Sequence, residues 1–145
     1  MSTVMFLPRL FAEQVTEQVA MISIGDPGQI LPAFATYHAH LLRLTFHDIE
    51  EDLGPEYQQF SYQDALKVLR FLSQVPEQEV VVHCEAGISR SVAIAKFMIE
   101  TLGYQQRLHP LAYSAMDRYN TDVYRQLRLA HLDLLSTTHE LLSAV

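Results

Sequence analysis

The segment that most constrains the fold is one continuous stretch in the second half of the chain. It begins with a valine run, Val80 to Val82, passes through a loop that holds the single cysteine, Cys84, and continues into an apolar stretch, Ile88 to Leu102. A continuous valine run is typical of a strand buried on both faces of a parallel sheet. The apolar stretch, which Gly103 ends, is typical of a buried helix. The sequence therefore predicts a cysteine loop between a central strand and a buried helix.

The remaining patterns predict an alternation of strands and helices. Strands rich in β-branched or alternating apolar residues are predicted near Val4–Leu7, Val19–Ile24, Leu41–Phe46 and Glu79–His83. Helices are predicted near Leu10–Gln18, from the N-cap Ser61 to Pro76, and near Leu111–Arg118 and Asp122–Leu142. Alternating strands and helices favour the α/β class, so we expect a central, mainly parallel sheet flanked by helices.

Length and charge limit the kinds of protein that this chain can be. At 145 residues and 49% hydrophobic composition, it is expected to form a single domain over residues 1–145. The net charge of -7, with only Lys67 and Lys96 as lysines, argues against a nucleic-acid or anionic-membrane partner. One cysteine forms no internal disulfide, and the N-terminus lacks a signal-peptide pattern, so a reduced, cytoplasmic setting is expected.

The cysteine loop has the composition of an anion-binding cradle. Cys84 is expected at the N-terminal end of a helix, where free backbone N–H groups favour its thiolate. Gly87 allows the backbone to turn tightly, and Arg90 can fold back as a planar fork onto two anionic oxygens. A tetrahedral oxyanion fits this arrangement.

The residues His83-Cys84-Glu85-Ala86-Gly87-Ile88-Ser89-Arg90-Ser91 resemble a known signature. It is that of the cysteine-dependent protein tyrosine phosphatases: His-Cys, five residues, Arg, then Ser or Thr. The Ala-Gly-x-Ser-Arg-Ser form is most similar to the dual-specificity branch, and the compact chain resembles bacterial-type enzymes. The matching of individual residues is confined to this loop and, more weakly, to an acidic loop upstream. The order of predicted elements agrees with the family fold over most of the chain.

The resemblance implies a two-step mechanism that needs no metal or cofactor. Cys84 attacks phosphorus to form a cysteinyl-phosphate, Ser91 hydrogen-bonds the leaving thiolate in the second step, and His83 supports the loop. The substrate implied is phosphotyrosine in a protein or peptide, with phosphoserine and phosphothreonine left open. The phosphate oxygens are held by Arg90 and by the loop amides of Glu85, Ala86, Gly87, Ile88, Ser89 and Arg90.

The family also supplies an aspartate, upstream of the cysteine, that protonates the leaving oxygen. Asp48, directly after the predicted strand Leu41–Phe46, is the expected general acid. Asp52 is the second candidate. The choice stays open to Glu50, Glu51 and Asp26 because the chain lacks the Trp-Pro-Asp form that would fix it.

Other functions remain open at this stage. A catalytically weak module that binds phosphoproteins and a rhodanese-type sulfurtransferase are the two alternatives, whereas arsenate reduction generally needs additional cysteines. A loop without lysine makes a polyphosphorylated inositol lipid a less favoured substrate. A metal site is a further, less favoured interpretation of His38, His40 and His47 with Asp48, because no other cluster has ligand spacing. The oligomeric state is left open.

Overall fold

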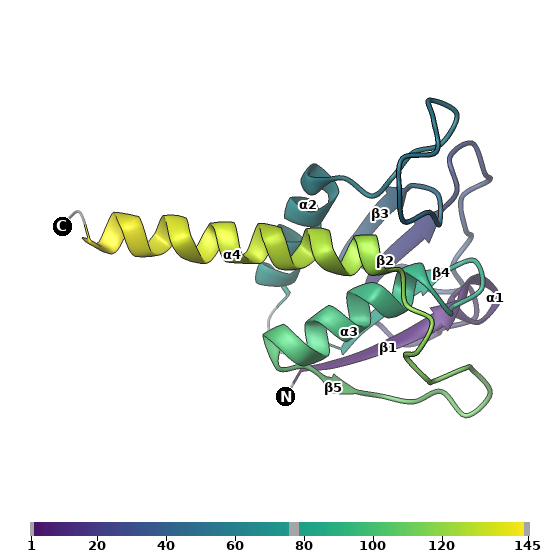
Figure 1. Cartoon of the computed structure of the whole chain (residues 1–145). Coiled ribbons are helices and arrows are strands. Elements are labelled where there is room, and N and C mark those ends of the chain that lie inside the picture. Colours follow the sequence, from purple (N-terminus) through teal and green to yellow (C-terminus); the bar gives the residue numbers. More distant parts are fainter. Residues whose placement is uncertain (1, 76–78, 144–145) are drawn as a thin grey trace.

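A computed structural model describes residues 2–75 and 79–143 of the chain. Five strands form one all-parallel sheet in the order β3-β2-β4-β1-β5 (Figure 1). The mainly parallel α/β class is therefore confirmed. The strands are β1 (Thr3–Pro8), β2 (Ala20–Gly25), β3 (Leu41–Thr45), β4 (Glu79–Cys84) and β5 (Gln105–Gln106), and the helices are α1 (Arg9–Ala12), α2 (Tyr62–Ser73), α3 (Arg90–Leu102) and α4 (Thr121–Ser143).

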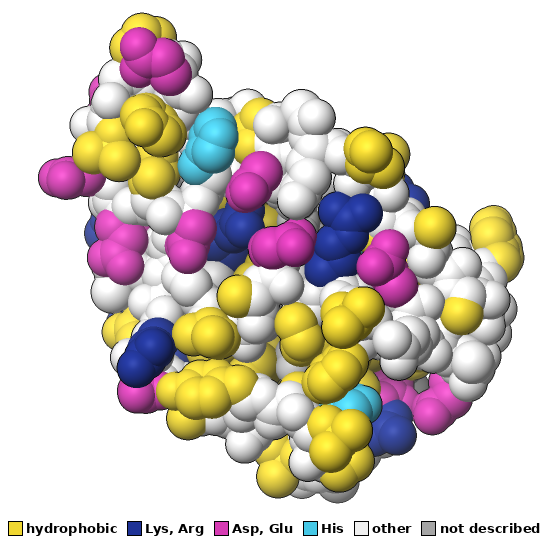
Figure 2. Space-filling view, turned by 90° about the vertical axis from the view of Figure 1, so that its right-hand side faces the viewer, with side chains coloured by type: hydrophobic (Ala, Val, Ile, Leu, Met, Phe, Trp, Pro, Cys, Tyr) yellow, Lys and Arg dark blue, Asp and Glu magenta, His cyan; other side chains and the backbone are white. Residues whose placement is uncertain are grey.

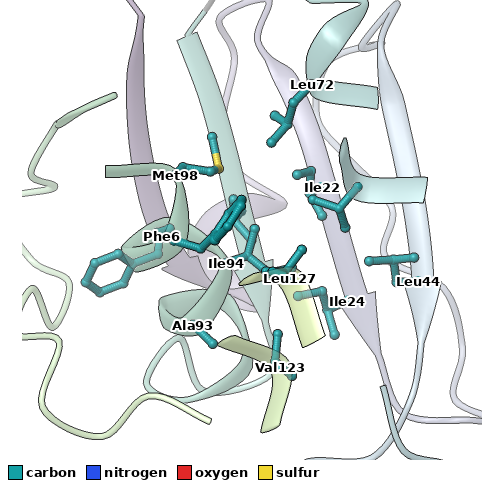
Figure 3. Packing of buried hydrophobic residues seen from close by; sticks show 14 of the residues in the cluster. Phe6, Ile22, Ile24, Leu44, Leu72, Ala93, Ile94, Met98, Val123 and Leu127 are labelled. Carbon is teal, nitrogen blue, oxygen red and sulfur yellow. The ribbon is translucent and has the colours of Figure 1, made fainter. Parts of the chain in front are cut away.

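The main core lies between the sheet and the three long helices. Successive residues of a strand point to opposite faces, so Val4 and Phe6 meet the helices while Met5 and Leu7 meet α1 and the loops on the other face. Burial of this apolar surface is the main force that holds the layers together. Figure 3 shows the packing of strand residues Phe6, Ile22, Ile24 and Leu44 with Leu72 of α2, Ala93, Ile94 and Met98 of α3, and Val123 and Leu127 of α4.

Two predicted helix boundaries are confirmed by their caps. The Ser61 side chain accepts a hydrogen bond from the Asp64 N–H at 3.0 Å, and the Asp64 carboxylate accepts one from the Ser61 N–H at 3.0 Å. This reciprocal pair is a capping box, and it starts α2. Gly103 ends α3 in the left-handed conformation, with φ 79°. Pro76, predicted to end α2, lies outside the described residues.

The prediction of a helix over Leu10–Gln18 is wrong beyond Ala12, where α1 ends. The reason is competition for backbone groups. The carbonyl of Glu13 accepts the Ala35 N–H at 2.8 Å, and the carbonyl of Thr16 accepts the Thr36 hydroxyl at 2.9 Å. These carbonyls bond a neighbouring loop and do not continue the helical ladder.

The prediction of a helix over Leu111–Arg118 is also wrong, because this segment forms turns and irregular structure. The carbonyl of Ser114 accepts a hydrogen bond from the Gln106 side chain at 3.1 Å, and Tyr113 bonds Asp117 through side chains. The sequence also gave no sign of the two-residue strand β5. The helix predicted from Ile88 starts later, at Arg90, so Ile88 and Ser89 belong to the cysteine loop.

The buried apolar residues of helix α4 include Val123, Leu127 and Ala130 in its first half, where the helix packs against α2 and α3. Figure 1 shows its C-terminal part extending past the edge of the sheet. Leu129, Leu132 and Leu135 of this helix are exposed. Within residues 2–75 and 79–143, the structure has no helix with both the length and the apolar character needed to cross a membrane.

Candidate active site

The cysteine lies at the carboxyl end of the central strand. Cys84 is the last residue of β4, which lies between β1 and β2, and Pro8 at the end of β1 is its partner in register. In a parallel sheet all carboxyl ends meet at one edge, and ligands of open α/β sheets bind there. Figure 2 faces this end of the molecule, where acidic and basic side chains gather across the middle of the surface.

The loop after Cys84 is folded tightly against the end of β1. Gly87 has φ 69°, and a Cβ added there would lie 2.4 Å from the nitrogen of Pro8 and 2.6 Å from the carbonyl carbon of Leu7. The Arg9 N–H also donates to the carbonyl of Glu85 at 3.2 Å. A side chain at position 87 would face both a strained backbone and a collision. The turn of the loop therefore depends on glycine at this position.

Two polar groups lie within hydrogen-bonding distance of the sulfur of Cys84, a residue that is 2% exposed. The Gly87 N–H donates to Sγ at 3.3 Å. The hydroxyl oxygen of Ser91, in the first turn of α3, lies 3.1 Å from Sγ. The sulfur therefore has an amide, a hydroxyl and a helix N-terminus as its neighbours. The arrangement can hold Cys84 as a nucleophile.

His83 is fully buried behind the loop. Its Nε2 lies 2.6 Å from the Ser23 hydroxyl oxygen, and its Nδ1 lies 3.3 Å from the carbonyl oxygen of Cys84. Burial, as the largest cause, lowers the pKa of His83 to about 4, so the ring is neutral near pH 7. Because a carbonyl only accepts, Nδ1 carries the proton and Nε2 accepts from Ser23. The ring thus links β4 to β2, consistent with a supporting role.

Arg90 is buried at the start of α3, with 5% of its surface exposed. Its Nη1 donates to Asp26 Oδ1 and to the carbonyl of Phe46, each at 2.7 Å. The guanidinium carbon also lies 5.9 Å from the centre of the Phe46 ring. Asp26, one of the alternative acids, is therefore the ion-pair partner of the loop arginine.

Asp48 lies beside the same loop. Its Oδ1 accepts hydrogen bonds from the Ser89 hydroxyl at 2.8 Å and from Asn120 Nδ2 at 2.9 Å. Both of these hydrogen bonds are to Oδ1, so they do not occupy Oδ2. The side chain is exposed, so a bound substrate could reach it.

The other candidate acids bond elsewhere. Asp52 Oδ1 accepts the Gly54 N–H at 2.9 Å within its own turn. Glu50 Oε2 accepts the Thr121 hydroxyl at 2.5 Å, and Glu51 is exposed. Of the five carboxylates considered, Asp48 and Asp26 are the two with side-chain hydrogen bonds to residues of the cysteine loop.

Sequence reasoning assigned no part in the site to Asn120. This fully buried side chain caps α4 by accepting the Val123 N–H at 3.0 Å, and it donates to Asp48 and to the carbonyl of Ile49. Its own N–H donates to the Ser89 carbonyl at 3.1 Å. Asn before an amphipathic helix is an N-cap signal that the sequence does carry. The contacts with Asp48 and Ser89 could not be predicted from the sequence, because they join segments that are distant along the chain.

Two of the histidines considered for a metal site have separate contacts. His47 Nδ1 accepts the Gln58 N–H at 2.9 Å, and His38 is buried beside Phe34. In the part of the chain that the structure describes, no group of three or more His, Cys, Asp or Glu side chains is placed to hold a metal ion.

A cavity of about 340 Å³ lies away from the cysteine loop, between α1 and residues 107–111. At its rim Arg107 pairs with Glu79 and lies 3.6 Å from Glu17. Arg107 is therefore engaged by two carboxylates, and none of the residues that line the cavity belongs to the loop around Cys84.

No protein-family model matches the chain, and a comparison with curated proteins gives no match either. A functional interpretation therefore depends on the residues of the site and on their geometry.

Proposed function

We propose that this protein is a phosphomonoester hydrolase that removes phosphate from phosphotyrosine in proteins through a cysteinyl-phosphate intermediate. The observation that carries the proposal is the environment of Cys84. The Gly87 N–H donates to its sulfur at 3.3 Å, and the Ser91 hydroxyl oxygen lies 3.1 Å from it. The loop contacts Asp48 and leads directly into the buried Arg90 at the start of α3. A nucleophile, a cation and a proton donor thus come together around one loop.

In the first step, the Cys84 thiolate attacks phosphorus, an S–P bond forms, and the P–O bond to the tyrosine breaks. Asp48 gives its proton from Oδ2 to the departing oxygen and becomes a carboxylate. Arg90 and the amides of the cysteine loop hold the three remaining phosphate oxygens, where negative charge is spread in the transition state.

In the second step, water attacks phosphorus and the S–P bond breaks. The Asp48 carboxylate takes a proton from the water, which restores the acid for the next cycle. The Ser91 hydroxyl donates to the leaving sulfur and stabilises it as a thiolate. Inorganic phosphate then leaves, and the atoms and charges balance over the two steps.

Charge narrows the substrate class. The loop carries the exposed Glu85 and no lysine, and the net charge is -7. These features disfavour a substrate with several phosphates, because each extra phosphate adds repulsion. They favour a phosphorylated protein segment. A reducing, cytoplasmic setting follows from the same proposal, since the thiol of Cys84 must stay reduced to act.

The proposal is tested by phosphate release from phosphotyrosine, phosphoserine and phosphothreonine peptides and from phosphoinositides. Wild type is expected to hydrolyse the phosphotyrosine peptide, and Cys84→Ser to lose at least about 10⁴-fold in rate. Wild type without turnover between pH 5 and 8, or an active Cys84→Ser variant, would contradict the proposal.

A second variant separates this mechanism from hydrolysis by another route. Ser91→Ala should leave the first step intact and slow the release of the thiolate. With para-nitrophenyl phosphate it should give a burst of nitrophenol, one equivalent per enzyme, followed by a slow steady state. A reaction that slows without a burst would remove the proposed role of Ser91.

A further inference from the structure

The buried guanidinium of Arg90 is anchored by one of its three nitrogens. Nη1 donates at 2.7 Å to the carboxylate of Asp26 and at 2.7 Å to the carbonyl of Phe46. Both bonds leave from the same nitrogen, so they do not occupy Nε or Nη2. These two nitrogens form the edge of the guanidinium that binds two oxygens of one anion side by side.

Asp26 is itself held in place by a turn at the end of β2. The Gln29 N–H donates to the Asp26 carbonyl at 3.1 Å, and the Asp26 N–H donates to Gln29 Oε1 at 3.3 Å. Gln29 Nε2 also lies 3.3 Å from Glu85 Oε2, in the cysteine loop. The turn over residues 26–29 therefore joins the loop at two places: through Gln29 to Glu85 and through Asp26 to Arg90.

Charge gives Asp26 a function that the Phe46 carbonyl cannot supply. Arg90 is 5% exposed, and a buried cation without a nearby anion is strongly unfavourable. The Phe46 carbonyl is neutral, whereas Asp26 places a carboxylate on the guanidinium before any phosphate is bound. The cation can then stay in its buried position between turnovers.

We infer that Asp26 is a positioning residue, which holds Nη1 of Arg90 so that Nε and Nη2 stay available to two phosphate oxygens. The inference rests on the proposed function, in which Arg90 stabilises the transition state. Asp26 touches neither substrate nor sulfur in this account and acts only through Arg90. The Phe46 carbonyl contributes the second fixed point, and Phe46 lies directly before the segment that carries Asp48.

The primary test is Asp26→Asn, assayed with para-nitrophenyl phosphate and with binding of orthovanadate. The amide keeps the shape of the side chain but loses the charge that orients Arg90. The expected result is a fall in kcat of about 10- to 100-fold with little change in KM, because orientation matters most in the transition state. Vanadate, which takes the geometry of that state, should bind more weakly by a similar factor.

A matched control exists on α3, the helix that carries Arg90. Glu100, near the other end of α3, pairs with Lys96 at 2.5 Å on the surface. Glu100→Gln makes the same chemical change to an ion pair far from the loop, and its kcat and vanadate affinity should equal those of wild type. Asp26→Glu keeps the charge and should recover part of the lost kcat; it also serves as the second variant if Asp26→Asn does not fold.

Dependence on Arg90 is tested by repeating the change in an Arg90→Met background, with high enzyme concentration and a reactive aryl phosphate. If Asp26 acts through Arg90, Asp26→Asn should change the residual rate of this variant by less than about twofold. A full 10- to 100-fold loss in that background would overturn the inference.

The possible outcomes separate this inference from the proposed function. An active wild type whose kcat is unchanged or raised by Asp26→Asn overturns the positioning role alone. A wild type without turnover that binds vanadate in an Asp26-dependent manner overturns the phosphatase proposal alone. A wild type that neither turns over nor binds vanadate overturns both.

Discussion

The two sides of the candidate site are built in different ways. On one side, the cysteine loop is a single unbroken stretch, folded by the end of β4, by Gly87 and by the start of α3. On the other side, Asp26, Asp48 and Asn120 come from three distant segments that meet only in the folded sheet. The first side depends on local backbone geometry and the second on topology. Changes to the glycine that shapes the loop should therefore affect folding most, and changes to the three residues on the other side should affect chemistry in a protein that still folds.

Asp48→Asn gives the largest expected effect and tests the side of the site formed by Asp26, Asp48 and Asn120. With phenyl phosphate, whose leaving group needs a proton, kcat should fall by about 10²–10⁴-fold. With 2,4-dinitrophenyl phosphate the loss should be much smaller, and the midpoint of urea unfolding should stay close to that of wild type. Steady-state kinetics with the two substrates measure the difference.

Glu50→Gln is the matched control, since Glu50 is an exposed carboxylate of the same segment that bonds Thr121. It should keep wild-type kcat with both substrates. If it instead shows the loss expected of Asp48, the role of general acid belongs to Glu50.

Gly87→Ala tests the loop side. The added Cβ would lie 2.4 Å from the Pro8 nitrogen, at a residue with φ 69°. Strain and collision together should lower the free energy of unfolding by about 3–5 kcal/mol, as measured by urea denaturation. Gly103→Ala is the control, because Gly103 has φ 79° with no neighbouring atom within 4 Å, so only the backbone strain of about 1 kcal/mol remains. Equal effects of the two substitutions would show that the contact with Pro8 is unimportant.

The pH dependence of stability tests the buried contact of His83 in β4 with Ser23 in β2. The unfolded chain takes up a proton on His83 below about pH 6.5, whereas burial holds the folded pKa at about 4. Between these pH values the unfolded state binds more protons, so stability should fall by about 3 kcal/mol as the pH drops from 6.5 to 4. His83→Gln lacks this titration, so its urea midpoint should approach that of wild type as the pH falls. A constant gap between the two proteins would contradict the assignment.

Asn120 gives the smallest expected effect and separates its two functions. Asn120→Asp keeps an oxygen that can accept the Val123 N–H and cap α4, but it can no longer donate to Asp48. The rate with phenyl phosphate should fall about 10-fold, with a smaller change for 2,4-dinitrophenyl phosphate. Asn120→Ala loses the cap as well and should unfold at a lower urea concentration. Loss of stability without this dependence on the leaving group would make Asn120 a structural residue only.

Local signals in the sequence were sufficient for much of the fold. The valine run of β4, the N-cap at Ser61 and the left-handed Gly103 each depend on residues within one turn or strand, and each was predicted correctly. The failures involve competition from distant residues. Helix α1 ends at Ala12 because Ala35 and Thr36 of a neighbouring loop bond the carbonyls of Glu13 and Thr16, and no local pattern predicts that contact.

The same distinction applies to the site. The position of the cysteine loop between a strand and a helix was predictable, because the residues that shape it lie in one stretch. Asp48 was placed beside the loop by its position after a strand, which is a topological argument. Asp26 was considered only as an acid, since its pairing with Arg90 depends on β2 and α3 meeting in space. Asn120 was recognisable as a cap and not as a partner of Asp48.

The pairing of β1 with β4 also has a consequence for the newly made chain. These strands are separated in sequence by two other strands and two helices, and such long-range parallel pairs form slowly. The loop is supported by Pro8 at the end of β1, so the sulfur stays unprotected until this late contact has formed. A chain that is still folding therefore carries an accessible thiol, and oxidation of this thiol to a sulfinic or sulfonic acid at that stage would be irreversible.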